Sequence, residues 1–180
     1  TLDPDATGVL LVGLGRVTRL LRFLTELPKT YTGEVVLGAE TSTLDAAGEV
    51  TATYDMSSVT DDDILAACAR FRGDMEQIPP MVSAIKIGGQ RLHTLARQGV
   101  EVDRPPRKVT SYRLVPGPLA DGAFPIEVEC SSGTYVRALA ADLGQALGGG
   151  TDDVSAFTLD PTTGAPTQAG SSVVTTGASP

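Results

Sequence analysis

The chain opens with Thr1-Leu2-Asp3-Pro4-Asp5-Ala6-Thr7-Gly8, followed by the apolar run Val9-Leu10-Leu11-Val12-Gly13-Leu14-Gly15. Proline restricts the residue before it to extended conformations, so Asp3 is expected on a stiff loop. The apolar run at residues 9–14 predicts a buried strand, and the residues from Gly15 onward predict a helix. A carboxylate on a rigid loop beside a strand is a suitable platform for a reactive group.

The same string also has an ordinary structural interpretation. Aspartate before proline is a common helix start, with aspartate as the N-cap and proline at the first helical position. Two related strings occur later in the chain, Thr43-Leu44-Asp45 and Thr158-Leu159-Asp160-Pro161. The opening motif alone therefore does not distinguish a reactive carboxylate from a helix cap.

The length and composition indicate one globular domain. The chain has 180 residues, of which 41% are hydrophobic, and that is enough to bury a core. No apolar run approaches the roughly 20 residues that cross a bilayer, so no membrane association is expected. There is no signal peptide, and because Thr1 is not an initiator residue we expect the chain to begin within a longer protein.

The cysteine and histidine content argues against a metal centre. Cys68 and Cys130 lack metal-ligand spacing, and we expect reduced thiols in a cytoplasmic protein. His93 is the single histidine and has no clustered ligands beside it, so a zinc site is not expected.

The charge is distributed unevenly along the chain. The formal net charge is −8, which by itself argues against a nucleic-acid partner. Residues 83–113, however, hold seven of the fourteen basic residues and only two acidic ones, so this segment carries +5 and the remainder −13. A basic strip on an acidic body fits a localised phosphate-binding face, and an ordinary solvated surface fits it equally well.

Hydrophobic periodicity and turn residues place the regular elements. We predict helices at residues 16–27, 60–73, 90–98 and 136–147, and strands at 31–37, 50–54, 83–87, 109–115 and 124–130. Thr60 and Asp63 resemble a capping box, and Gly73 is expected to close that helix. Arg137 lies in the first turn of the last helix, where the helix dipole disfavours a cation, so it is a candidate partner for an anion. Residues 151–180 lack periodicity and are expected to form a loosely packed tail.

Five separated motifs occur in one order along the chain: Leu2-Asp3-Pro4 with Ala6-Thr7-Gly8-Val9-Leu10, then Lys29-Thr30-Tyr31, Pro79-Pro80 with Ser83-Ala84-Ile85-Lys86, Ala96-Arg97-Gln98-Gly99, and Gly133-Thr134-Tyr135-Val136-Arg137. This set closely resembles the tRNA pseudouridine synthase B family, the bacterial relatives of dyskerin, over roughly residues 1–150. The combination is far more specific than any single motif.

The resemblance implies an α+β fold, with a mixed, mostly antiparallel sheet flanked by helices and truncated here at the N-terminus. Residues 1–150 would form a partial catalytic core, and residues 151–180 a tail that does not match the family. The family isomerises uridine 55 in the T loop of tRNA without metal or organic cofactor. We expect a monomer that acts on the T-arm of tRNA.

The same resemblance assigns the site residues. The catalytic aspartate falls on Asp3, the active-site tyrosine on Tyr31, and the arginine that pairs with the aspartate on Arg137. The expected substrate-binding residues are Tyr135, Lys86, Arg91, Arg97, Arg107 and Lys108. A carboxylate nucleophile would divide the isomerisation into easier steps, an arginine would keep it charged, and an aromatic ring would stack on the extruded base.

Two alternatives remain open from the sequence. The chain could be an RNA-binding module or an inactive fragment without turnover, as its acidic total charge and unmatched ends indicate. A guide-RNA-dependent enzyme like dyskerin is the other, and no surface for accessory proteins is recognisable in the sequence.

Overall fold

The computed structural model describes residues 8–100, 102–148 and 156–161. Its main element is a five-stranded sheet in the order β4-β7-β8-β1-β9, in which every pairing between neighbours is antiparallel. The strands are β1 (Lys29–Val36), β4 (Gly73–Gln77), β7 (Arg107–Pro116), β8 (Ala123–Cys130) and β9 (Ala156–Pro161). The expected mostly antiparallel α+β fold is therefore confirmed.

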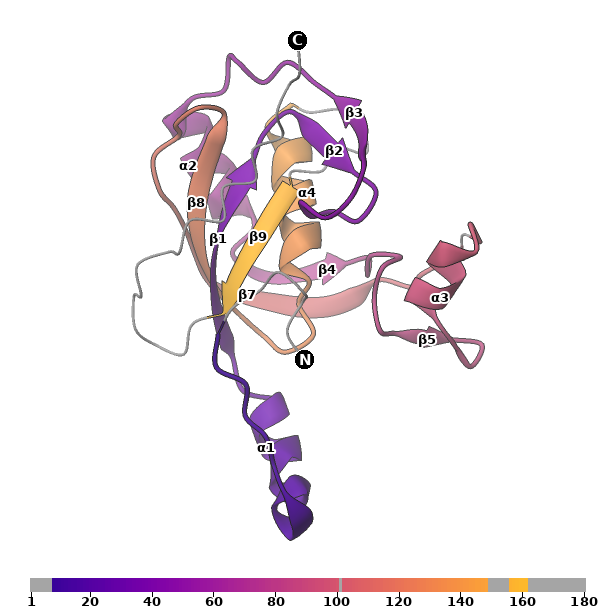
Figure 1. The fold of residues 1–180 in the computed structure, drawn as a ribbon. Coiled ribbons are helices and arrows are strands. Elements are labelled where there is room, and N and C mark those ends of the chain that lie inside the picture. The colour runs from indigo at the N-terminus through magenta and orange to yellow at the C-terminus, as the bar shows by residue number, and fades with distance from the viewer. Residues whose placement is uncertain (1–7, 101, 149–155, 162–180) are drawn as a thin grey trace.

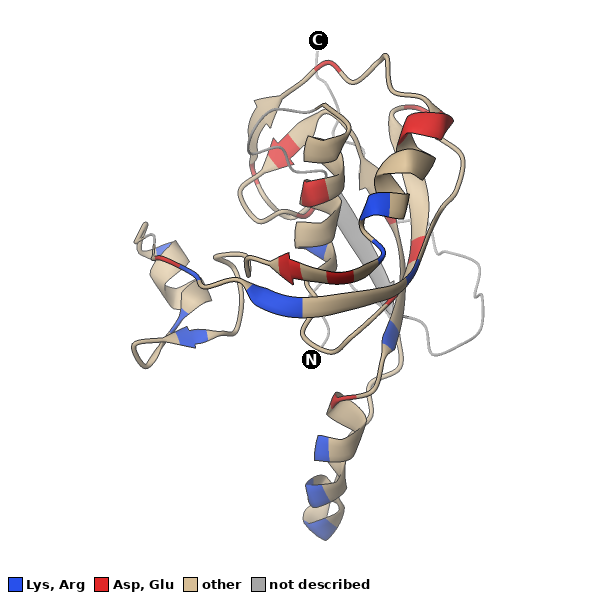
Figure 2. Ribbon diagram, turned by 180° about the vertical axis from the view of Figure 1, so that it is seen from behind, with Lys and Arg blue, Asp and Glu red and all other residues tan. Residues whose placement is uncertain are grey.

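Helices α2 (Asp61–Arg70) and α4 (Val136–Ala146) cover one face of this sheet (Figure 2). In β8 the residues at even positions, from Phe124 to Cys130, are buried, whereas those between them are exposed or half-buried. This alternation is typical of a sheet with a single covered face. The core consists of these strand residues together with the apolar stripes of the two helices and Val35 of β1.

The capping box predicted at the start of α2 is present. The Thr60 hydroxyl accepts from the backbone N–H of Asp63 at 3.3 Å, and the Asp63 carboxylate accepts from the backbone N–H of Thr60 at 3.0 Å. The expected stop at Gly73 was wrong, because the helix ends at Arg70 and Gly73 begins β4 with a φ of 92°. Glycine adopts this conformation at little cost, and it turns the chain into the edge strand.

Five short elements complete the described parts of the fold, two on the body and three on a projection beside it. Strands β2 (Ala39–Thr41) and β3 (Val50–Thr53) form an antiparallel pair above the main sheet (Figure 1). Strands β5 (Lys86–Ile87) and β6 (Gln90–Arg91) form a tight hairpin through Gly88 and Gly89, followed by α3 (Leu92–Arg97). The hairpin and α3 project sideways from the N-terminal end of β7 (Figure 1). We call residues 81–106 the projection.

The prediction of a buried strand at residues 9–14 was wrong. These residues form no strand, and Leu14 is 80% exposed. They lead into a 3-10 helix, η1 (Gly15–Leu20), and α1 (Leu21–Thr25), which point away from the sheet (Figure 1). Strand β9 lies in the segment expected to be a loosely packed tail, so that expectation was wrong for residues 156–161.

Among the described residues, every helix is too short or too polar to cross a lipid bilayer.

Candidate active site

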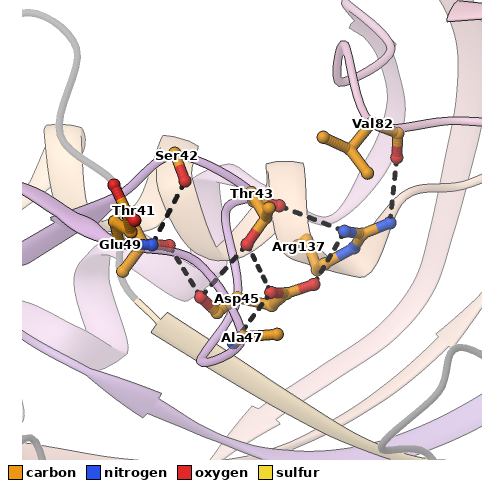
Figure 3. A network of polar contacts seen from close by, with 8 residues as sticks. All are labelled: Thr41, Ser42, Thr43, Asp45, Ala47, Glu49, Val82 and Arg137. Atoms are coloured by element: carbon orange, nitrogen blue, oxygen red, sulfur yellow. Dashed lines mark hydrogen bonds and ion pairs between the residues drawn. The ribbon is translucent and has the colours of Figure 1, made fainter. Parts of the chain in front are cut away.

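Arg137 is the centre of a buried polar network at the start of α4 (Figure 3). Its side chain is only 10% exposed. One terminal nitrogen, Nη1, donates to the Asp45 carboxylate at 2.8 Å and to the Thr43 carbonyl at 3.0 Å. The other, Nη2, donates to the Val82 carbonyl at 3.3 Å. The guanidinium thus joins α4 to two other segments of the chain, and the anion that the described residues place on it is Asp45.

The loop between β2 and β3 holds the Asp45 carboxylate in place (Figure 3). Oδ1 accepts from the Thr43 hydroxyl at 2.5 Å and from the Ala47 N–H at 3.1 Å, which leaves Oδ2 for Arg137. The Asp45 carbonyl accepts from the Thr41 hydroxyl at 2.7 Å and from the Gly48 N–H at 3.2 Å. An aspartate that bonds its own backbone two residues on forms a tight local turn, and here that turn presents one carboxylate oxygen to the arginine.

Gly48 is required by the close packing of this loop. A Cβ at this position would lie 2.4 Å from the Thr43 hydroxyl oxygen and 2.8 Å from the Thr43 nitrogen. Thr43 supplies both the hydroxyl that orients Asp45 and the carbonyl that accepts from Arg137. The absence of a side chain at residue 48 therefore allows the two sides of the loop to approach each other this closely.

The Val82 carbonyl lies at the beginning of the projection, next to the segment that joins the projection to β4. Pro79 and Pro80 are buried within this segment, and the Pro79 carbonyl accepts from Nη1 of Arg104 at 3.1 Å. Arg137 and Arg104 therefore bond backbone carbonyls near the beginning of the projection, which fixes its attachment to the body.

Tyr135 is half-buried and is the N-cap residue of α4. Its backbone is held by Gln77, the last residue of β4, through two hydrogen bonds of 2.7 and 2.9 Å. Tyr31 lies in β1 opposite Val128 of β8, and its side chain packs against the same core as the apolar stripe of α4. The structure thus places both tyrosines on elements that border the core beneath Arg137.

Asp3 lies outside the described residues, so its pairing with Arg137 stays a prediction. The carboxylate that the structure places on Arg137 is Asp45, which the sequence analysis missed as a site residue. A signal was available, because Thr43-Leu44-Asp45 precedes Ala46-Ala47-Gly48, a string typical of a tight turn. Nothing local in that string indicates a partner ninety-two positions away.

The five predicted basic substrate-binding residues are all exposed and cluster on the projection and the adjoining start of β7 (Figure 2). They are Lys86, Arg91, Arg97, Arg107 and Lys108. Arg113, at the far end of β7, instead forms an ion pair with Glu127 on β8. The five exposed cations thus form a surface on the projection and the start of β7, separate from the buried network around Arg137.

Three titratable side chains beside the core have perturbed acidities. Burial raises the pKa of Asp142, on α4, to about 6. Burial likewise raises the pKa of the Cys68 thiol to about 11 and raises the pKa of Cys130. Both cysteines are buried free thiols, which makes them packing residues and not nucleophiles.

The chain matches known proteins over most of its length. The sequence profile of the TruB family pseudouridylate synthases (N-terminal domain) matches residues 1–136. The tRNA pseudouridine synthase B of Rhodococcus jostii is 54% identical over 151 residues, covering 82% of this chain and 50% of that protein. The tRNA pseudouridine synthase B of Symbiobacterium thermophilum is 50% identical over 150 residues, again covering 82% and 50%. The chain thus spans about half the length of the curated relatives it matches.

Solved structures share the fold. In a Cbf5-Nop10-Gar1 complex, a chain 24% identical in sequence superposes with a TM-score of 0.63 over 90% of this chain and 38% of that one. A chain in an H/ACA RNP bound to a substrate RNA containing 2′-deoxyuridine is 21% identical, with a TM-score of 0.58 over 90% of this chain and 36% of that one. The family match covers more than two thirds of the residues and includes the segments that carry Arg137's acceptors, and the fold agrees with it. The chain therefore belongs to the TruB family of pseudouridylate synthases.

Proposed function

We propose that the chain is the catalytic core of a tRNA pseudouridine synthase that isomerises uridine 55 in the T loop. Asp3 acts as the nucleophile, Tyr31 lies against the extruded base, and Arg137 is the cation beside the reacting carboxylate. Family membership and the order of the five motifs in this chain support the proposal. The observation that carries it is the buried guanidinium of Arg137 at the start of α4, which donates to the loop of Thr43 and Asp45 and to the segment of Val82.

The chemistry follows from these groups. The C1′–N1 bond of the uridine breaks, the uracil turns, and a C1′–C5 bond forms, while the hydrogen at C5 leaves to solvent and N1 takes up a proton. A carboxylate on Asp3 forms and releases a covalent intermediate, so that no single step must exchange both bonds. Arg137 stabilises the charged form of that carboxylate, and Asp45 orients Arg137.

The exposed cations of the projection bind the phosphates of the T-arm in this proposal. Phosphate contacts position an RNA without reading its sequence, and arginine and lysine are the residues that make them. The projection is attached to the body next to Arg137, so an RNA held along it would present a flipped base to the site. We further propose a cytoplasmic monomer, with residues 1–150 as the catalytic core. Residues 151–180 do not match the family, although residues 156–161 add the edge strand β9 to the sheet of that core.

The test is tritium release from tRNA labelled at uracil C5. The 180-residue chain is expected to release tritium in proportion to pseudouridine formed, and Asp3→Asn to abolish the release. Asp5→Asn, two residues away in the same motif, serves as the matched control and should retain turnover. An Asp3→Asn protein with undiminished turnover would refute the assignment.

A second function is favoured by the exposed cations of the projection, which can hold an RNA backbone without a reacting carboxylate. The chain would then bind tRNA through the projection without isomerising it. Filter binding measured beside tritium release separates the two functions. Tight binding of tRNA with no release of tritium from the unaltered chain would favour the binding module.

A further inference from the structure

The side chain of Gln77 joins the edge strand β4 to the start of α4. Both the oxygen and the nitrogen of its amide take part in this contact. Gln77 is 3% exposed. Its Nε2 donates to the Tyr135 carbonyl at 2.9 Å, and its Oε1 accepts from the Tyr135 N–H at 2.7 Å. The amide therefore pairs with the backbone of one residue as a neighbouring strand would.

An amide is the side chain suited to this position. It offers one donor and one acceptor in a plane, which match the N–H and C=O of a backbone residue. Tyr135 is the N-cap of α4 and makes no side-chain cap hydrogen bond of its own. Its carbonyl also accepts from the backbone N–H of Leu139 at 3.0 Å, so the contact with Gln77 is made at the first turn of the helix.

The residues near Gln77 in sequence contact the same turn a second time. Val82, five residues after Gln77, accepts from Nη2 of Arg137, two residues after Tyr135. The segment from 77 to 82 is thus fixed to the start of α4 at both of its ends. Losing the contact at Gln77 would free the helix start to shift along β4, and Arg137 would move with it.

We propose that Gln77 is a positioning residue, which sets the start of α4 so that the guanidinium of Arg137 reaches Asp45 and Val82 together. The consequence for turnover rests on the proposed function. The consequence for the geometry of Arg137 does not, and it can be measured separately. A displacement of about 1 Å at a reacting group can reduce a rate by about 100-fold, which sets the scale of the expected effect.

The first measurement is NMR of the arginine side chains in the ¹⁵N-labelled 180-residue chain. A guanidinium held by three acceptors rotates slowly about its Nε–Cζ bond, so Arg137 should give separate Nη1 and Nη2 signals, assigned by their loss in Arg137→Lys. In Gln77→Met, which keeps the length of the side chain and removes both hydrogen bonds, these signals should merge. The control is Gln145→Met, at an exposed position on α4, the helix that carries Arg137. This substitution should leave the two signals separate.

The second measurement is the rate of tritium release. Gln77→Met should lower kcat by up to about 100-fold while the KM for tRNA stays unchanged, because the exposed cations are untouched. In the Arg137→Lys background the same substitution should add little further loss, because its effect passes through Arg137.

The outcomes separate the two proposals. Either of two results would overturn the positioning role. One is separate Nη1 and Nη2 signals in a folded Gln77→Met protein; the other is a loss of kcat in the double variant equal to the combined losses of Gln77→Met and Arg137→Lys. If Gln77→Met fails to fold, Gln77→Glu takes its place, because it keeps the oxygen that accepts from Tyr135 and loses the donor. Unchanged Arg137 signals in Gln77→Glu would equally overturn the positioning role. An unaltered chain whose signals respond as expected but which releases no tritium leaves the positioning role standing and ends the proposed function.

Discussion

The guanidinium of Arg137 and the carboxylate of Asp45 lie 2.8 Å apart in a nearly buried ion pair, although ninety-two positions separate them in the chain. Removing either partner takes an ion-pair contact away from a nearly buried charge, which costs about 3–5 kcal/mol. We expect Asp45→Ala and Arg137→Ala each to lower the free energy of unfolding by this amount, as measured by urea denaturation. The double variant should lose less than the sum of the two.

The exposed ion pair of Arg113 and Glu127 provides the matched control, since its side chains are 54% and 39% exposed. Arg113→Ala should cost at most about 1 kcal/mol, because water screens the charge that remains. A loss at Arg137 no larger than that at Arg113 would contradict the buried network.

Gly48→Ala is expected to disturb the site through sterics alone. The added Cβ would lie 2.4 Å from the hydroxyl oxygen of Thr43, so the loop must open, at a cost of about 1–3 kcal/mol. The carboxylate of Asp45 then loses its alignment with Arg137, and tritium release per folded molecule should fall.

Gly117→Ala is the control for this substitution. Its Cβ would lie 2.5 Å from Cγ of Pro125 in the hairpin between β7 and β8, so it should also destabilise the fold. Its tritium release, corrected for the folded fraction, should match that of the unaltered chain. Equal losses of release in both variants would show that Gly48 acts only on stability.

The free energy of unfolding should depend on pH through Asp142. Burial raises the pKa of Asp142 from its ordinary 3.8 to about 6, so the folded chain binds this proton more tightly than the unfolded chain does. Below about pH 4 Asp142 is protonated in both states and burial costs nothing; the cost of burying the ionised carboxylate grows as the pH rises to about 6 and stays constant above that range.

Asp142→Asn should accordingly raise the free energy of unfolding at pH 7, by about 3 kcal/mol at most, and change it little at pH 3. Urea denaturation across this range measures the difference between the two proteins. The exposed Asp103→Asn should show no such difference. A substitution at Asp142 that has the same effect at both pH values would contradict the role of burial.

Binding of tRNA should depend on salt through the cations of the projection. Each phosphate contact contributes about 0.7–0.9 to the slope of log affinity against log salt concentration. Lys86→Ala, Arg91→Ala and Arg97→Ala should each lower this slope by about 1 in filter-binding titrations. Arg70→Ala, an exposed arginine on α2, should leave the slope unchanged, and an equal reduction there would contradict a localised binding face.

The two buried thiols should resist alkylation in the folded chain. With a pKa of about 11, only about one Cys68 side chain in a thousand is a thiolate at pH 8, and both cysteines are covered by the core. Iodoacetamide at pH 8 should modify Cys68 and Cys130 at the rate at which the chain unfolds. Rapid modification of the native protein, measured by mass spectrometry, would contradict this packing.

Much of the fold could be predicted from the sequence because its signals are local. The start of α2 is specified by two side chains three residues apart, Thr60 and Asp63, and the hairpin of β7 and β8 by two alternating strands around a glycine-containing turn. The strands at the two edges of the sheet were not predicted. Strand β4 is short and polar, and β9 lies in a segment rich in small residues, so their pairing with β7 and β1 carries no local pattern.

The same difference between local signals and long-range contacts decides which site residues could be predicted. Arg137 was found as a candidate because a cation in the first turn of a helix opposes the local dipole. Asp45 and Gln77 were missed, because an aspartate in a turn and a glutamine at a strand end are ordinary residues there. Only the three-dimensional arrangement shows that each is turned toward the start of α4.

The network around Arg137 also has a consequence for how the chain folds. Its acceptors at Thr43, Asp45 and Val82 are 94, 92 and 55 positions away, so closing these contacts costs far more loop entropy than forming the helices or the hairpins. We expect the helices and the local hairpin of β7 and β8 to form first, and the guanidinium to find its acceptors late, together with the equally long-range pairing of β1 with β8. Folding intermediates of this chain would then hold its helices and that hairpin while lacking the network around Arg137, and recovery of turnover after dilution from denaturant would lag behind recovery of helical circular dichroism.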